Sequence, residues 1–271
     1  MLEIRDFSKY YTKDRATVSH LSLTVPDGHI TGFIGHNGAG KTTTLRCIAG
    51  ILDFSDGHIL IDGHDIQKAP VAAKRVTAFL PDDPELYDFM SGIRYLQLVA
   101  DLYSIPADIR RERIEPLAES YQMTGVLGSP ISSYSHGMKQ KLALISAFMR
   151  QPKLLILDEP FVGLDPSATY ITKEHLKKLC EGGSSVLFST HVLEVAEKLC
   201  DRIAIIRKGT LIEEGPTSRI VGQKGLESVF MELSADNKED SMRNFIILWL
   251  HRTVLHAAFS GLKTSKKTLK R

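Results

Sequence analysis

The segment "FIGHNGAGKTT", residues 33–43, constrains the fold of this chain more than any other stretch of the sequence. It places Gly35, Gly40, Lys41 and Thr42 in the spacing Gly-x4-Gly-Lys-Thr, after an apolar run typical of a strand and before a helical pattern. Glycines at these positions let successive backbone N–H groups turn inward around phosphate oxygens. The sequence therefore predicts a phosphate-binding loop between a buried strand and a helix.

The residue types in this loop indicate how a nucleotide would be held. Lys41 can reach the β- and γ-phosphates, and the Thr42 hydroxyl can be a ligand of Mg²⁺. The predicted ATP-binding residues of the loop are Gly35, His36, Asn37, Gly38, Ala39, Gly40, Lys41, Thr42 and Thr43.

A second segment, "LLILDEP" at residues 154–160, supplies two acids at the end of an apolar run. We expect Asp158 to hold Mg²⁺, commonly through a water, and Glu159 to polarise the water that attacks the γ-phosphate. The alternative for paired acids at a strand end is a solvated turn. The four apolar residues before Asp158 make that alternative the weaker one.

Apolar runs alternate with helical patterns along most of the chain, which predicts an α/β fold with a mostly parallel sheet. The helical pattern continues from about residue 87 to 150 and is expected to be an insertion. The predicted strands lie near residues 2–7, 21–25, 29–34, 59–61, 76–80, 154–157, 186–188 and 203–206.

Composition and charge exclude several classes of protein. The three cysteines form no C-x-x-C pair, so we expect neither a disulfide framework nor a zinc site. The N-terminus does not resemble a signal peptide, and no uncharged apolar run reaches the ~18 residues of a membrane span. Residues 237–271 carry a net charge of +6, which leaves −4 on the first 236 residues and argues against a nucleic-acid groove.

The segment "SYSHGMKQKLALISAF", residues 133–148, contains a second anion-binding pattern. Leu142, Ile145 and Phe148 recur at helical spacing, and the helix is expected to begin near Ser135. A serine and a glycine amide at a helix N-terminus can bind an anion. This pattern raises the question of why one chain would carry two phosphate-binding segments.

The motifs "GHNGAGKTT", "YSHGMKQK", "LLILDEPFVGLDP" and "FSTHV", in this order, resemble those of the ATP-binding subunits of ABC transporters over about residues 1–233. The resemblance implies a P-loop NTPase (RecA-like) core with an antiparallel β subdomain and an inserted helical subdomain. It also implies that Ser135, His136, Gly137 and Met138 form the signature segment, which contacts the nucleotide of a second copy in a head-to-tail dimer. His136 replaces the first glycine of the family's signature.

The same resemblance assigns further residues. Tyr11 lies where the family stacks an aromatic ring on adenine. Its neighbour Tyr10 is the other candidate for this position, and the alternative role for either tyrosine is to pack on the core. Asp165 matches the loop that links the two sites of a dimer. His191 matches the histidine that hydrogen-bonds the γ-phosphate.

One position departs from the family's pattern. In "PDDPELY", Asp82 stands where the family has a glutamine that reaches Mg²⁺ and the attacking water. A carboxylate binds Mg²⁺ more strongly than an amide but cannot donate a hydrogen bond at neutral pH. We therefore expect nucleotide binding to be retained, with Asp82 as a further Mg²⁺ ligand and an altered water geometry.

The C-terminal region predicts three further features. Residues 226–233 resemble the end of cassettes from ABC-2-type exporters, residues 234–241 are expected to be a linker, and residues 242–271 an amphipathic basic helical tail. This tail can lie on a membrane surface or a partner, or pack locally; the sequence leaves both alternatives open.

The sequence thus predicts an ATP-hydrolysing subunit that uses ATP and Mg²⁺ to drive an exporter. Its expected partners are transmembrane permease subunits and a second ATPase subunit, without nucleic acid, at the cytoplasmic face of the membrane. The alternative functions are a soluble regulatory ATPase of the same family and a nucleotide sensor that hydrolyses ATP weakly.

Overall fold

The computed structural model describes residues 1–12 and 15–233 of the chain. Two compact units are present, Met1–Leu226 and Glu227–Arg271. Of the second unit, residues 227–233 are described and are helical. The predicted linker at residues 234–241 and the tail at residues 242–271 lie outside the described residues.

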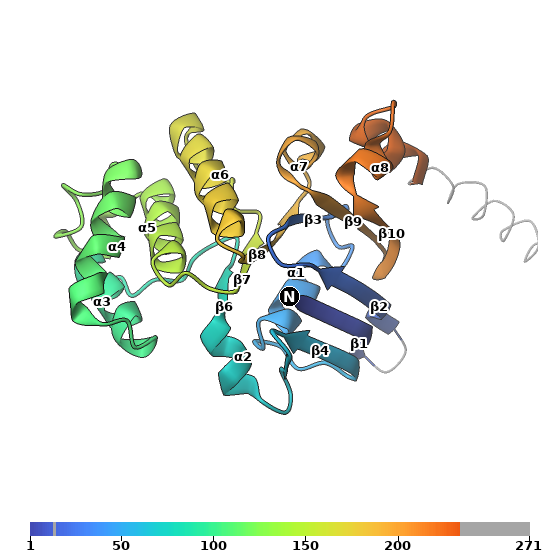
Figure 1. Cartoon of the computed structure of the whole chain (residues 1–271), viewed down its shortest axis with the longest axis horizontal. Helices are drawn as coiled ribbons and strands as arrows, with labels where there is room; N and C mark the ends of the chain where they lie inside the picture. The colour runs from blue at the N-terminus through green and yellow to red at the C-terminus, as the bar shows by residue number, and fades with distance from the viewer. Residues whose placement is uncertain (13–14, 234–271) are drawn as a thin grey trace, which may run out of the picture. The chain divides into compact units, whose positions relative to one another are not determined.

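A six-stranded sheet forms the centre of the first unit (Figure 1). Five of its strands, from β6 at one edge to β9, pair in parallel with their neighbours. The sixth strand, β10, pairs antiparallel to β9 and forms the other edge. In spatial order, the strands are β6 (Thr77–Leu80), β7 (Leu154–Asp158), β8 (Ser185–Thr190), β3 (Ile30–Ile34), β9 (Arg202–Arg207) and β10 (Thr210–Pro216). Every residue of β3, β7 and β8 is buried, as expected for apolar strands covered on both faces.

A second, antiparallel sheet is formed by four strands in the order β2, β1, β4 and β5. Their bounds are Arg15–Val25, Leu2–Thr12, Asp56–Ile61 and His64–Asp65. Alternate residues of β1, such as Leu2 and Ile4, are buried in one cluster with Leu45 and Ile48 of helix α1 (Lys41–Ile48). Because both sheets contribute to this cluster, α1 and the loop before it are held firmly at the centre of the unit.

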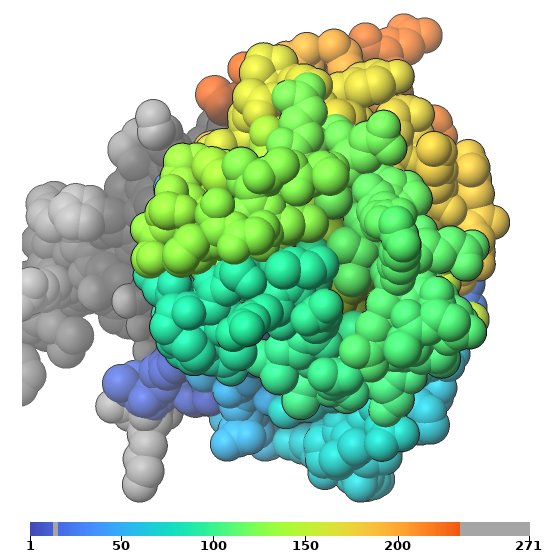
Figure 2. Space-filling model, turned by 90° about the vertical axis from the view of Figure 1, so that its left-hand side faces the viewer, coloured from blue at the N-terminus to red at the C-terminus, as the bar shows by residue number. Residues whose placement is uncertain are grey.

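The remaining helices cover the sheets or form the insertion between β6 and β7. The insertion contains α3 (Gly92–Leu102), α4 (Ala107–Ser120) and α5 (His136–Phe148). Figure 2 shows this helical block in green, with residues of α6 in yellow beside it. The helices outside the block are α2 (Pro70–Val76), α6 (Pro166–Glu181), α7 (Leu193–Leu199), α8 (Thr217–Val221) and the helical residues up to 233 named above.

The predicted fold class is confirmed: a parallel core, an antiparallel β subdomain and an inserted helical block are all present. The strand predicted at residues 2–7 extends to Thr12, and the edge strands β5 and β10 were not predicted because they lack apolar runs. No helix within the described ranges has the length and apolar character that a bilayer span requires.

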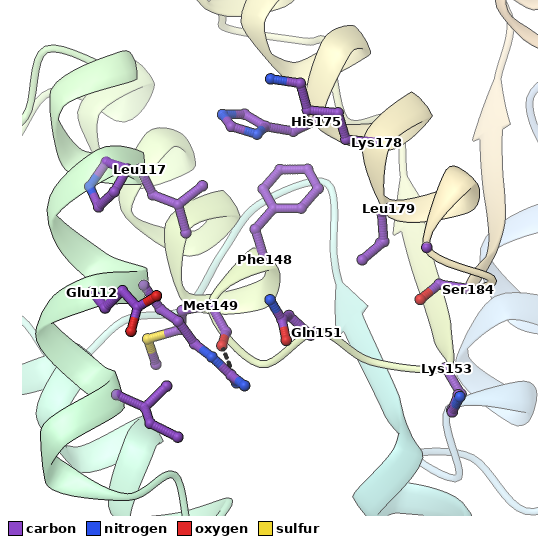
Figure 3. Close-up of a pocket in the computed structure, with 14 residues that line it drawn as sticks. Glu112, Leu117, Phe148, Met149, Gln151, Lys153, His175, Lys178, Leu179 and Ser184 are labelled. Carbon is purple, nitrogen blue, oxygen red and sulfur yellow. Dashed lines mark hydrogen bonds between the residues drawn. The ribbon is translucent and has the colours of Figure 1, made fainter.

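Two cavities in different parts of the first unit bear on function. One, of about 270 Å³, surrounds the glycine-rich loop. The other, of about 800 Å³, opens between α4, the end of α5 and α6 (Figure 3).

Candidate nucleotide-binding site

The glycine-rich loop between β3 and α1 follows a path that side chains would obstruct. Gly40, the N-cap of α1, has a φ of 107°, a region that L-residues rarely adopt. A Cβ at Gly35 would lie 2.4 Å from the backbone oxygen of Ile206 on β9. The loop can therefore pass this close to β9 only with glycine at position 35.

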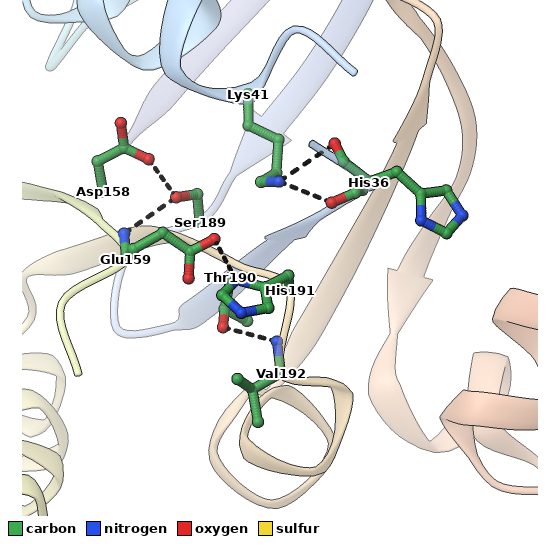
Figure 4. A network of polar contacts seen from close by, with 9 residues as sticks. His36, Lys41, Asp158, Glu159, Ser189, Thr190, His191 and Val192 are labelled. Atoms are coloured by element: carbon green, nitrogen blue, oxygen red, sulfur yellow. Dashed lines mark hydrogen bonds and ion pairs between the residues drawn. The ribbon is translucent and has the colours of Figure 1, made fainter. Parts of the chain in front are cut away.

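Lys41 is buried and curls back over this loop. Its Nζ donates hydrogen bonds to the carbonyl oxygens of Gly35, at 2.6 Å, and His36, at 3.4 Å (Figure 4). Burial lowers the pKa of Lys41, whereas the charges of Glu159 and Asp158 oppose this effect. Phosphate oxygens near Nζ would add further negative charge and favour the protonated amine.

Asp158, at the end of β7, has one carboxylate oxygen that accepts a hydrogen bond and one that does not. Oδ1 accepts a hydrogen bond from the Ser189 hydroxyl of β8, while Oδ2 is buried without a hydrogen-bond partner. A buried unpaired carboxylate oxygen is costly unless a cation compensates it, and oxygen ligands suit Mg²⁺. The residues present therefore fit a magnesium ion beside Oδ2.

No group of three or more His, Cys, Asp or Glu within the described part of the chain is arranged to hold a metal by itself. A magnesium ion here would complete its coordination with the Thr42 hydroxyl, water and phosphate oxygens, as Mg²⁺ commonly does.

Glu159 follows Asp158 in a left-handed backbone conformation, with a φ of 46°. Its N–H donates to Ser189 Oγ at 3.1 Å, and its Oε1 lies 2.9 Å from Nδ1 of His191 (Figure 4). Positive φ at a non-glycine residue is strained and is often found at functional sites. Ser189 thus orients both acids of the site, a role that was not predicted from the segment "FSTHV", in which Ser189 lies.

The structure brings most of the predicted site residues to one cavity. His36, Asn37, Gly38, Gly40, Lys41, Thr42, Thr43, Asp82, Asp158 and Glu159 line it, together with Thr17. Thr17 on β2 was not predicted, because no motif marks it. His191 lines an adjoining cavity of about 120 Å³ that it shares with Glu159.

Tyr11 lies apart from this cavity, at the end of β1. Its side chain is 59% exposed, and the Nζ of Lys9 lies 5.1 Å from the centre of its ring. Tyr11 is therefore not packed on the core, which removes one alternative for this residue. Its contact with adenine stays a prediction.

The predicted signature residues lie outside the cavity of their own chain. Ser135 is the N-cap of α5, where its hydroxyl accepts a hydrogen bond from the Met138 N–H at 3.3 Å. The His136 ring packs over Gly163, so closely that a Cβ added at Gly163 would lie 2.6 Å from Cδ2 of His136. Its Nδ1 is 3.7 Å from Oδ1 of Asp83, the neighbour of Asp82.

Asp165 links the loop after Glu159 to the same helix. It caps α6 by accepting a hydrogen bond from the Ala168 N–H at 2.8 Å, and it pairs with Lys141 of α5 at 2.7 Å. The hydrogen bond from Lys141 is the main cause that lowers the pKa of Asp165. No motif in the sequence marks Lys141 for this role.

Comparison with known proteins agrees with this geometry. The family described as "ABC transporter" matches residues 18–162, and the chain belongs to the family of ABC transporter ATP-binding proteins. This is a family of ATPases that bind ATP and generally hydrolyse it, and whose ATP-binding subunits work with transmembrane subunits.

Particular relatives extend the similarity to most of the chain. The ABC-type transporter ATP-binding protein EcsA of Bacillus subtilis is 34% identical over 246 residues, or 89% of this chain and 98% of EcsA. Nod factor export ATP-binding protein I of Cupriavidus metallidurans is 34% identical over 222 residues, or 82% and 73% of the two chains. A solved ATP-binding subunit of an ABC transporter superposes with a TM-score of 0.83 at 32% identity, and covers 86% of this chain and 99% of its own.

Proposed function

We propose that this protein hydrolyses ATP to power a membrane exporter. The observation that carries the proposal is the unpaired Oδ2 of Asp158 beside the glycine-rich loop, next to a Glu159 that His191 holds in place. A cavity that combines phosphate-binding amides, a lysine, a free cation ligand and an oriented carboxylate has the parts that phosphoryl transfer to water requires.

In the proposed reaction, the loop amides and Lys41 bind the phosphates, while Thr42, Asp158 and Asp82 are the candidate Mg²⁺ ligands. The ion would supply charge neutralisation at the β- and γ-phosphates. Glu159 accepts a proton from water as the water oxygen bonds to the γ-phosphorus and the bond to the bridging oxygen breaks. The products are ADP and inorganic phosphate.

The contact between His191 and Glu159 determines which His191 nitrogen can face phosphate. In the neutral ring, Nδ1–H donates to the carboxylate of Glu159, so Nε2 has no proton to donate. A hydrogen bond from Nε2 to the γ-phosphate therefore requires the protonated imidazolium. We infer that His191 both orients Glu159 and, when protonated, stabilises the negative charge of the phosphate.

We further propose that two copies, or this chain and a related one, assemble head to tail with ATP between them. Ser135, His136, Gly137 and Met138 line no part of their own chain's nucleotide cavity, although Ser135 and the Gly137 amide are suited to bind phosphate. In such a dimer, this segment would contact the nucleotide bound in the cavity of the other chain. ATP then joins the two chains, and hydrolysis separates them.

A groove beside the nucleotide cavity supports the proposed permease partner. It has a volume of about 550 Å³ and runs along the loop 81–87, α3 and α5. Tyr87 and Leu102 line it and are largely exposed, at 52% and 71%. Exposed apolar side chains in one groove favour a protein contact, and we assign it to a segment of the transmembrane subunits.

The export direction rests on the resemblance of residues 226–233 to ABC-2-type exporters and on the similarity to a Nod factor export protein. The proposed organisation is a cassette at residues 1–233, a linker at 234–241 and a basic tail at 242–271 that holds the subunit at the cytoplasmic membrane surface. Blue-shifted Trp249 emission on addition of anionic vesicles would support this role of the tail, because Trp249 is the one tryptophan of the chain.

The test of the proposed function uses Glu159→Gln. This variant should bind ATP but release phosphate at least ~100-fold more slowly, because only the proton acceptor is lost. It should also elute as an ATP-dependent dimer in size-exclusion chromatography. Phosphate release at the parent rate would refute Glu159 as the base, and a monomer at saturating ATP would refute the dimer.

A further inference from the structure

The cavity between α4, the end of α5 and α6 has no role in the proposed reaction. Its volume of about 800 Å³ lies within the range of small-molecule sites. Residues of α4, the end of α5, α6 and the segment before β7 surround one hollow (Figure 3). Its lining residues come from 109–117, 148–153 and 175–184, three segments that are far apart in the sequence.

Three cationic side chains are among the residues that line this cavity. Arg113 lies on α4, Lys178 on α6 and Lys153 directly before β7. None of the three forms an ion pair with a carboxylate of the described residues, although Arg113 donates a hydrogen bond to the Met149 carbonyl oxygen. Glu112 is the one acid among the lining residues.

This excess of positive charge is local. The first 236 residues carry a net charge of −4, so the three cations stand out against an acidic body. A cleft lined mainly by one sign of charge concentrates its potential and attracts ligands of the opposite sign. Three cations line the cavity against one acid, Glu112, and no carboxylate of the described residues lies within ion-pair distance of them, although Lys153 also acts on Asp27. This excess of positive charge favours an anionic ligand.

The floor of the cavity is aromatic, and the rings of Phe148 and His175 are tilted by 40° relative to one another. The His175 ring lies 5.2 Å from Phe148, measured between ring centroids, and stacks on Tyr121. Ser120 donates its hydroxyl proton to the Leu117 carbonyl oxygen, so it accepts a hydrogen bond from Nε2–H of His175 at 3.1 Å. Burial and the nearby charge of Lys178 lower the pKa of His175, which favours the neutral, apolar form of the ring.

Gln151 adds a polar group at an unusual backbone position. It follows the end of α5 with a φ of 48°, where helices commonly place glycine. Its side chain nevertheless lines the cavity, with its amide between Phe148 and Lys153 in the view of Figure 3. An amide at this place can donate or accept a hydrogen bond from a ligand.

We propose that this cavity binds a small, flat organic anion with at least two acidic groups. The ring of such a ligand packs on Phe148 and His175, and its acidic groups reach Arg113, Lys153 and Lys178. Arg113 belongs to the inserted helical block and Lys178 to α6, so a ligand that contacts both side chains connects these two parts of the structure. Occupancy therefore restrains the helical block, which carries the signature residues, relative to α6.

Naphthalene-1,5-disulfonate is a suitable probe, because it combines a flat ring with two permanent negative charges. Isothermal titration calorimetry on the full chain, with ADP saturating the nucleotide cavity, should detect one site whose affinity falls as salt is raised. Lys178→Gln and Arg113→Gln should each weaken binding about fivefold or more, since each removes one contact between opposite charges.

Lys177→Gln is the matched control. Lys177 is the neighbour of Lys178 on α6 but pairs with Glu174 at 3.2 Å and does not line the cavity. This variant should bind the probe within about twofold of the parent, as expected for the loss of a surface charge at a distance. Absence of binding, or equal affinities of the Lys177→Gln and Lys178→Gln variants, would overturn the proposal.

Discussion

The nucleotide cavity and the cavity between α4, α5 and α6 both offer positive charge to an anion, but they are built in different ways. The first is lined largely by residues 36–43 of one continuous loop, whose backbone path requires Gly35 and Gly40. The second is assembled from side chains of three distant segments. A site made by the backbone of one segment leaves a local pattern in the sequence, whereas a site made by distant side chains does not.

The two cavities also differ in how their charges are compensated. Lys41 is buried, is hydrogen-bonded to two carbonyl oxygens and lies in the field of Asp158 and Glu159. Arg113, Lys153 and Lys178 face no described carboxylate within ion-pair distance. The charges of the nucleotide cavity therefore suit a ligand that brings both phosphate and a cation, whereas those of the second cavity suit the proposed organic anion.

The largest expected effect separates the two cavities directly. Lys41→Ala should weaken ATP binding about 100-fold or more, because a buried charge-assisted contact to phosphate is lost. Lys178→Gln, which removes a cation of the second cavity, should leave ATP affinity within about twofold. Titration with a fluorescent ATP analogue measures both, and an equal loss in the two variants would show that the cavities are not independent.

A somewhat smaller effect tests whether the backbone path of the loop decides nucleotide affinity. Gly35→Ala places a Cβ 2.4 Å from the Ile206 carbonyl oxygen, so the loop must shift away from β9. We expect ATP binding to weaken by about tenfold or more, or ~1.4 kcal/mol. Gly128→Ala is the control, because no atom lies within 4 Å of its added Cβ. Unchanged affinity in Gly35→Ala would mean that the close approach to β9 is not needed.

Asp82 provides a more moderate test of charge in the nucleotide cavity. Asp82→Gln removes a negative charge beside the expected γ-phosphate and restores a hydrogen-bond donor for the attacking water. Turnover should rise, while nucleotide affinity stays within about tenfold, or ~1.4 kcal/mol. Steady-state phosphate release measures this change. Slower turnover would show that the carboxylate itself assists the reaction.

The smallest expected effect concerns the floor of the second cavity. His175 has a lowered pKa in the folded protein, so the unfolded chain binds more protons below the ordinary histidine pKa of 6.5. Its stabilising effect is present above about pH 6.5 and is lost progressively as the pH falls from there through the lower pKa of the folded protein. Urea unfolding at pH 7.5 and 5.5 should therefore show a smaller pH-dependent loss of stability in His175→Gln than in the parent. The same loss in both proteins would contradict this pKa shift.

Much of the fold could be predicted because its central strands are apolar on both faces. β3, β7 and β8 are buried along their whole length and contain short apolar runs, and burial of such runs leaves few alternatives to a covered parallel sheet. The edge strands β5 and β10 could not be predicted in the same way. They are short or polar, and pairing with a neighbour rather than their own composition makes them strands.

The sequence by itself determined the parts of the site that depend on local backbone geometry: the glycine-rich loop, the acids at the end of β7 and the serine cap of α5. Tertiary structure decided which distant side chains complete them. Ser189 contacts Asp158 and Glu159 because β8 pairs with β7, and Lys141 contacts Asp165 because α5 packs near the start of α6. The physical reason is the distance along the chain over which each property is set. Backbone conformation depends mainly on adjacent residues, whereas contacts between distant side chains depend on how the sheet and helices pack.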